Sequence, residues 1–159
     1  MTEQTCGFTG HREIPADKVD FVKRELRAEI MKAINDGFTH FISGFADGAD
    51  LWFSAIVAEL KAENPALQLE AAIPYRKRLA KLMDNEETKA LVLACNIIGV
   101  HSEDYSQDCY MKRNRFIVAQ AGRMIAVYDG REKGGTLSTM RFAHVHEREI
   151  REIRIDKAE

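Results

Sequence analysis

Three short glycine-containing loops each follow an apolar run, and they constrain the fold more than any other feature of the chain. The loops are residues 9–12 (TGHR), residues 43–50 (SGFADGAD) and residues 129–136 (DGREKGGT). Glycine lets the backbone approach a ligand closely, and a helix that starts beyond such a loop directs free N–H groups and the positive end of its dipole toward an anion. Three such loops at the ends of successive strands predict one phosphate-binding crevice.

Strand-like and helix-like segments alternate along the chain. Between Val19 and Ala33, for example, apolar residues recur every three or four positions, which predicts a helix that ends near Gly37. The expected strands are residues 6–9, 38–43, 67–73, 97–100, 124–128 and 150–155, and the other expected helices are residues 50–63, 79–94, 112–121 and 136–146. This alternation predicts an α/β fold, a Rossmann-like, doubly wound and mainly parallel sheet with helices on both faces, in a single domain over residues 1–159.

Charge and cysteine content restrict the partners and the compartment. The formal net charge of −2 argues against nucleic acid as a partner, because non-specific binding to phosphates needs an excess of cations. Cys6, Cys95 and Cys109 form no CxxC pair, which favours a reducing cytoplasm. No run approaches the roughly 20 apolar residues of a membrane span. We expect no membrane partner, and a homodimer is an open alternative to a monomer.

Common cofactor motifs and metal motifs are missing. The first loop has one glycine where the dinucleotide fingerprint G-x-G-x-x-G needs more, and the loop at Gly44 and Gly48 lacks the lysine of a P-loop. His144 and His146 point in different directions in a helix and lack a third ligand. We therefore expect no NAD-type cofactor, no ATPase of the P-loop type and no metal site.

The first loop offers a phosphate-binding arginine. Arg12 follows a predicted strand end, and its planar guanidinium suits a phosphate or carboxylate held by two hydrogen bonds. Pairing with Glu13 at the surface is the alternative. Two roles are also open for His11: donation to a ligand, or capping of local backbone groups.

The second loop and the fifth predicted helix add polar candidates. Ser43 and Gly44 predict a tight turn. Asp50 either caps the following helix or accepts a hydrogen bond from a ribose hydroxyl. Arg113 and Asn114 hold a second phosphate or a ribose if their segment borders the crevice, and otherwise they form a solvated helix start.

The third loop gives the strongest candidate for a phosphate site. Gly134, Gly135 and Thr136 stand at an expected helix N-terminus, where two glycines and a hydroxyl supply backbone donors and one adjustable side-chain donor. A plain loop with a helix cap is the alternative.

Taken together, these motifs resemble those of the YpsA-type branch of the SLOG superfamily, Rossmann-like proteins that include the LOG enzymes and the DNA-processing protein DprA. The resemblance covers nearly the whole chain and rests on residues 9–12, 43–44, 48–52, 73–75, Met111, 113–114, 134–136 and Ala143. It implies a nucleotide-related ligand in the crevice and a sensor or signalling role.

Three functions are compatible with these observations. The first is binding or sensing of a nucleotide-derived, phosphate-bearing small molecule, such as a nucleoside phosphate or an ADP-ribose-like compound, without catalysis. The second is a LOG-like phosphoribohydrolase that cleaves the N-glycosidic bond of a nucleotide. LOG enzymes carry the pattern G-G-x-G-T-x-x-E, and here the glutamate after Thr136 is missing. The third is DprA-like binding of single-stranded DNA, for which the sequence shows neither a charge excess nor a row of stacking aromatics.

Overall fold

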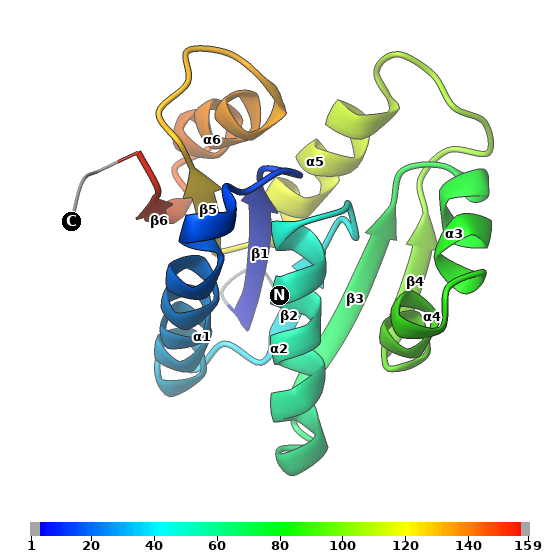
Figure 1. Ribbon diagram of the computed structural model, residues 1–159, viewed down its shortest axis with the longest axis horizontal. Coiled ribbons are helices and arrows are strands. Elements are labelled where there is room, and N and C mark those ends of the chain that lie inside the picture. The colour runs from blue at the N-terminus through cyan, green and yellow to red at the C-terminus, as the bar shows by residue number, and fades with distance from the viewer. Residues whose placement is uncertain (1–3, 157–159) are drawn as a thin grey trace.

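The computed structural model describes residues 4–156, and its centre is a six-stranded sheet with the order β4-β3-β2-β1-β5-β6. All neighbouring strands are parallel. The strands are β1 (Thr5–Gly10), β2 (His40–Ser43), β3 (Gln68–Ile73), β4 (Ile97–Val100), β5 (Arg123–Tyr128) and β6 (Glu149–Arg154). This arrangement confirms the predicted Rossmann-like α/β fold (Figure 1).

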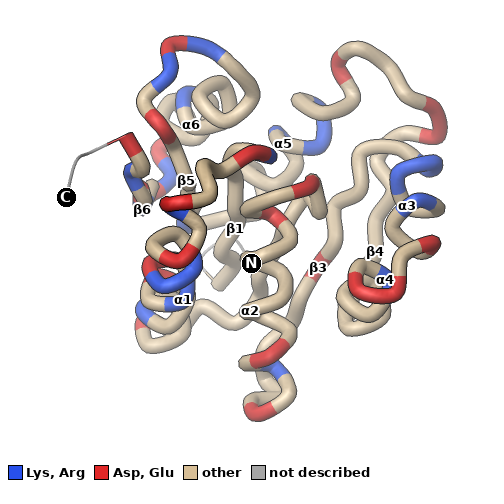
Figure 2. Tube along the Cα trace, in the orientation of Figure 1, with Lys and Arg blue, Asp and Glu red and all other residues tan. Residues whose placement is uncertain are grey.

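Helices cover both faces of the sheet. They are α1 (Val19–Asn35), α2 (Ala49–Glu63), α3 (Arg76–Met83), α4 (Glu86–Leu93), α5 (Cys109–Gln120) and α6 (Gly135–Val145), with a short 3-10 turn, η2 (Ala16–Lys18), before α1. Residues of α1, α2, α3 and α4 share one apolar cluster with the sheet, and residues of α5 and α6 pack on the opposite face. The charged residues belong mostly to the helices and loops around this core (Figure 2).

Close packing around β1 explains two features of its sequence. Phe8 points into the face under α2, where its ring stacks on Phe53 with 4.9 Å between centroids. On the other face, a Cβ at Gly7 would lie 2.7 Å from both Ile117 and Met124, so only glycine lets α5 approach the strand this closely. Burial of each large apolar side chain contributes about 1.5–3 kcal/mol.

One predicted element is wrong: residues 79–94 form two helices instead of one. Asn85 adopts an extended backbone conformation, and its Oδ1 accepts the backbone N–H groups of Glu87 and Thr88 at 2.9 and 3.2 Å. This N-cap, with Glu86 and Glu87 in the first turn of α4, stabilises a new helix start. The apolar periodicity continues across the break, which is why periodicity alone predicted one helix.

Candidate functional site

The candidate site lies where the chain reverses direction across the sheet, beside β1 and β5. The chain moves outward from β1 through β2, β3 and β4, and then crosses back to place β5 on the other side of β1. The helices that follow β1 and β5, α1 and α6, pack on opposite faces, so the two preceding loops separate at this edge. Doubly wound folds bind ligands at such a reversal.

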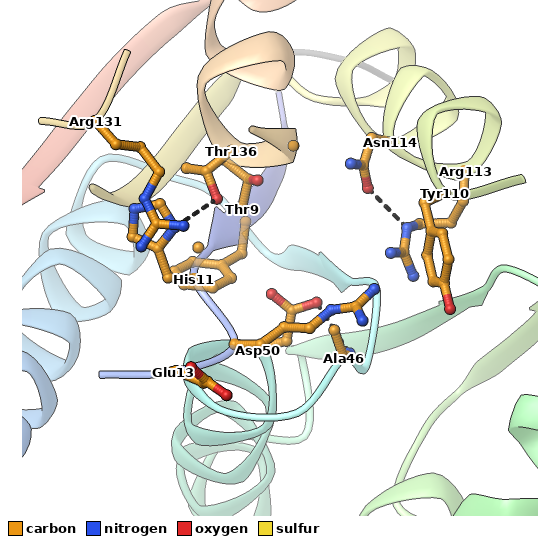
Figure 3. Close-up of a pocket in the computed structure, with 14 residues that line it drawn as sticks. Thr9, His11, Glu13, Ala46, Asp50, Tyr110, Arg113, Asn114, Arg131 and Thr136 are labelled. Atoms are coloured by element: carbon orange, nitrogen blue, oxygen red, sulfur yellow. Dashed lines mark hydrogen bonds between the residues drawn. The ribbon is translucent and has the colours of Figure 1, made fainter. Parts of the chain in front are cut away.

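A cavity of about 440 Å³ occupies this edge, a volume within the range of small-molecule sites. Figure 3 shows α5 contributing one wall and the start of α6, with Arg131, the opposite wall, while Asp50 lies between them. The lining residues are Phe8, Thr9, Gly10, His11, Arg12, Glu13, Ala46, Asp50, Tyr110, Arg113, Asn114, Arg131, Gly135 and Thr136.

Most of the predicted site residues therefore meet in one cavity, although they come from four separate segments. The predicted residues that line it are Gly10, His11, Arg12, Asp50, Arg113, Asn114, Gly135 and Thr136. Ser43, Gly44 and Gly134 do not line it. The fully buried Ser43 closes the loop after β2, where its Oγ accepts the backbone N–H of Phe45 at 3.1 Å.

The start of α6 is the open wall of the cavity. Gly134 precedes the helix with φ of +118°, a conformation that favours glycine, and no side chain in residues 4–156 caps the helix. A Cβ built on Gly135 meets no atom within 4 Å, so the space beside this backbone is free. The first N–H groups of a helix have no partner within the helix. They therefore face a cavity in which an anion would find both donors and a favourable dipole.

His11 holds the loops after β1 and β5 together. Its Nε2 accepts the backbone N–H of Asp129 at 3.2 Å, and its Nδ1 lies 3.4 Å from Oγ1 of Thr136. Burial lowers the pKa of His11, although Asp129, whose Oδ1 lies 3.1 Å from Nε2, opposes the decrease. Of the two predicted roles, capping of backbone groups is the one that these contacts favour.

Arg113 forms the fixed wall opposite α6. The residue is 4% exposed, and its Nη1 donates to the carbonyl oxygens of Gly44 and Ala72 at 2.6 and 3.2 Å. Its Nε donates to Asn114 at 2.7 Å, while the amide of Asn114 donates to Thr139 in α6 at 3.0 Å. These bonds position a buried positive charge and tie α5 to both neighbouring segments.

Asp50 places a carboxylate in the same cavity. Its Oδ2 accepts the backbone N–H of Ala46 at 3.1 Å, so this carboxylate closes the loop before its own helix. Burial raises the pKa of Asp50 to about 6, although Arg113 and Arg12 oppose the increase. Within the described chain, the carboxylate of Asp50 accepts no other hydrogen bond. Its second oxygen, Oδ1, is therefore available to a donor in the cavity.

Arg12 is the exposed cation of the cavity. Its guanidinium carbon lies 4.6 Å from the ring centroid of Tyr110, in a cation–π contact. Across residues 4–156 its side chain makes neither an ion pair nor a hydrogen bond, so the predicted alternative of a pair with Glu13 is not found. All donors of this guanidinium are free for a ligand.

Sequence analysis missed two prominent lining residues, Tyr110 and Arg131. Tyr110 stands one helical turn before Arg113, but the predicted helix began at residue 112 and so excluded it. Arg131 belongs to the third glycine loop itself, where it makes a two-point ion pair with Asp129 and lowers the pKa of that carboxyl to about 2. The spacing of one helical turn between Tyr110 and Arg113 places both on the same side of a helix, and this signal could have identified the tyrosine.

The position of the LOG glutamate is filled by a structural residue. Thr139 stands there, and its Oγ1 donates to the carbonyl of Gly135 at 2.8 Å. The carboxylates of the cavity are those of Asp50 and Glu13, which come from other segments.

Residues 4–156 contain no group of three or more His, Cys, Asp or Glu side chains arranged to hold a metal ion. In the same part of the chain no helix has the length and apolar character needed to cross a membrane.

The fold is similar to that of a solved DNA-binding protein. The neighbour is DNA processing protein A from Helicobacter pylori, whose structure is described as giving insight into its single-stranded DNA binding mode. The superposition has a TM-score of 0.69 at 17% identity and covers 99% of this chain and 69% of the neighbour.

This neighbour corrects one expectation, that nucleic acid is an unlikely partner. A protein of the same fold is described as binding single-stranded DNA, so the low net charge gave no ground for that exclusion. The physical reason is that net charge averages over the whole surface, whereas Arg12, Arg113 and Arg131 concentrate positive charge at one cavity.

Sequence comparisons identify relatives among bacterial proteins. A UPF0398 protein of Enterococcus faecalis is 29% identical over 143 residues, which cover 87% of this chain and 79% of the relative. A UPF0398 protein of Ligilactobacillus salivarius is 26% identical over 124 residues, which cover 75% of this chain and 67% of that relative. The sequence model of the YspA SLOG family (YpsA) matches residues 9–157. The chain therefore belongs to the YspA SLOG family.

Proposed function

We propose that this chain binds a nucleotide, with the phosphate at the N-terminus of α6 and the nucleoside in the cavity between α5 and α6. One observation carries the proposal: an uncapped helix start with free space at Gly135 opens into the same cavity as the unpaired guanidinium of Arg12. Backbone donors, a helix dipole and a free arginine together match the charge and the acceptors of a phosphate.

The remaining lining residues suit the nucleoside. Asp50 offers an acceptor for a hydroxyl or amino group, and Tyr110 offers an aromatic ring beside the cavity. Tyr110 lies across the cavity from the start of α6, and Asp50 lies between the two (Figure 3), so a phosphate at Gly135 directs the rest of the nucleotide toward them. A nucleotide-derived small molecule would make these contacts, and so would one nucleotide of a strand.

Single-stranded DNA is the second candidate ligand. The DNA-binding neighbour of the same fold favours it, as do the cations Arg12 and Arg113, whose guanidinium carbons lie 4.6 and 5.9 Å from the ring centroid of Tyr110. A cationic groove with an aromatic ring is the usual equipment of proteins that bind single strands.

The test compares thymidine 5′-monophosphate (dTMP) and AMP with thymidine and adenosine. A ligand at about 100 times its Kd stabilises the fold by about 2.7 kcal/mol. For a chain of this size, the melting temperature rises by about 5 to 10 °C. We expect this rise with the phosphorylated compounds and a much smaller one with the nucleosides. Equal shifts for both classes, or no shift with either, would overturn the proposal.

Gly135→Asp separates binding from folding. The new carboxylate fits the free space at Gly135 but repels a phosphate at the helix start, so we expect loss of dTMP binding with the melting temperature nearly unchanged. Ser138→Asp is the matched control, because it adds the same charge to an exposed position of α6 outside the cavity. If Gly135→Asp retains its affinity for dTMP, the phosphate binds elsewhere.

A further inference from the structure

A second cavity continues the first one beyond Arg12 and Tyr110. It has a volume of about 190 Å³, and it shares Arg12, Ala46, Tyr110 and Arg113 with the larger cavity. Its other wall is formed by the segment after β3 and by α3, which contribute Tyr75, Arg78 and Lys81 among others. Because four residues border both spaces, the two cavities form one groove along the edge of the sheet.

The second cavity is cationic. Lys81 is exposed and makes no ion pair or hydrogen bond through its side chain with any described residue. Arg78 donates to the carbonyl of Phe45 at 2.7 Å and to Asp47 at 3.1 Å, so it is partly neutralised. Figure 2 shows the basic residues of α3 facing those at the start of α5 across the end of β3. An anion in this cavity would meet Lys81 first, with Arg12 beside it.

Three tyrosines stand beside this cavity. Tyr75, Tyr105 and Tyr110 are arranged edge to face, with ring centroids 5.4 to 6.1 Å apart. Tyr105 is 61% exposed, an unusual degree for a large aromatic residue within a cluster. The loop that carries it is held by the two-point bond between Arg76 and Glu103. Tyr75 and Tyr110 line the second cavity, and Tyr105 packs against both from outside it. An exposed aromatic ring in this position is suited to base stacking.

The size of the second cavity limits what it can hold. A volume of about 190 Å³ is below the range of roughly 300–1,000 Å³ for complete small-molecule sites. It accommodates part of a nucleotide, such as a phosphate, while the attached base lies outside on the tyrosines. A mononucleotide in the first cavity leaves this space unused.

We propose that the second cavity binds the adjoining phosphate of a single-stranded nucleic acid, whose base stacks on Tyr105, so that the groove holds two successive nucleotides. This inference rests on the proposed function, because the first nucleotide occupies the cavity at α6. Lys81 neutralises the second phosphate, while Arg12, which borders both cavities, lies between the two phosphates. Tyr105 supplies a stacking surface that tolerates any base.

The experiment compares dTMP with the 5′-phosphorylated thymidine dinucleotide by calorimetry in the full chain. We expect the dinucleotide to bind at least about 10-fold more tightly than dTMP, since it adds a charge contact and a stacked base. Lys81→Gln should remove most of this gain and leave dTMP binding unchanged. For the dinucleotide, the slope of log affinity against log salt should become less steep by about 0.7. Lys77→Gln, an exposed lysine of α3 outside both cavities, is the matched control.

Tyr105 provides an independent variant. Tyr105→Ala should weaken dinucleotide binding by about 5- to 150-fold, whereas Tyr105→Phe keeps the ring and should retain the affinity. Binding of dTMP without any gain for the dinucleotide would overturn the second site while leaving the first intact. Equal effects of Lys81→Gln and Lys77→Gln on dinucleotide binding would also overturn the second site. Absence of binding for both probes would overturn the proposed function together with this inference.

Discussion

Two of the three glycine loops, those after β2 and β5, look alike in sequence but differ in what they do. In the loop after β2, Gly44 is covered by the guanidinium of Arg113, and Gly48 has φ of +83° with the carbonyl of Arg12 directly beside it. At the start of α6, Gly135 has no neighbour within 4 Å of a built Cβ. The glycines of the loop after β2 are needed for packing, whereas those at the start of α6 keep a surface open.

This difference divides the cavity into a fixed wall and an open wall. The fixed wall consists of the loop after β2 together with Arg113 and Asp50, which are buried and hydrogen-bonded to backbone groups. The open wall consists of the loop after β5 and the start of α6, where Arg131 and Gly135 are exposed. Changes in the fixed wall should therefore alter stability, and changes in the open wall should alter binding.

The largest effect is expected from Arg113→Ala. Removal of this guanidinium leaves the buried Asp50 without its nearest opposing charge and two carbonyl groups without a donor, so the free energy of unfolding should fall by about 3–5 kcal/mol. Arg131→Ala, on the open wall, removes only an exposed ion pair and should cost no more than about 1 kcal/mol. Chemical denaturation measures both. Similar losses of unfolding free energy in Arg113→Ala and Arg131→Ala would contradict the division into a fixed wall and an open wall.

A smaller, pH-dependent effect is expected from Asp50. Its pKa is about 6 in the folded state against 3.8 ordinarily, so the folded state holds the proton more tightly than the unfolded chain. Stability from this group is complete below about pH 4 and is lost as the pH rises through about 6, with a total of about 3 kcal/mol. Asp50→Asn has no proton to lose and should avoid this loss. The difference in unfolding free energy between wild type and Asp50→Asn should thus grow between pH 4 and 7, and a constant difference would contradict the burial argument.

The smallest effect on stability concerns backbone conformation at Gly48. Alanine there must adopt a positive φ and also contact the carbonyl of Arg12, so Gly48→Ala should lower the free energy of unfolding by about 1–3 kcal/mol. Gly37→Ala is the matched control, since Gly37 has φ of +100° but no atom near its built Cβ. The excess loss at Gly48 measures the contact itself. Equal losses of unfolding free energy in Gly48→Ala and Gly37→Ala would show that the loop before α2 moves to make room for the new side chain.

The sequence was sufficient to predict the fold because its signals are local and agree with one another. Apolar runs that end in glycine loops predicted the strands, and helical periodicity predicted most of the helices between them. The break before α4 was missed because the capping by Asn85 interrupts the backbone without interrupting the apolar pattern. That sequence, Asn followed by two glutamates, is itself a helix-start signal.

The site was only partly predictable, since side-chain roles depend on contacts between distant segments. Arg12 and Gly135 line one cavity because both follow the carboxyl ends of parallel strands, whereas the place of Arg113 was left open between the crevice and a solvated helix start. Whether Asp50 caps its helix or its loop depends on the φ and ψ angles of the preceding turn. The place of Tyr110 depends on how α5 packs on the sheet. The expectation from net charge was wrong because charge is distributed unevenly over the surface.

The central claim is that the open wall receives the phosphate of a nucleotide. The most direct measurement is a titration followed by ¹H–¹⁵N NMR, with dTMP and thymidine as the two ligands. We expect the backbone amides of Gly135 and Thr136 to shift with dTMP, to reach a plateau and to move far less with thymidine. Saturable dTMP binding that leaves both amides unmoved, while it shifts a distant group such as the indole N–H of Trp52 between α1 and α2, would contradict the account.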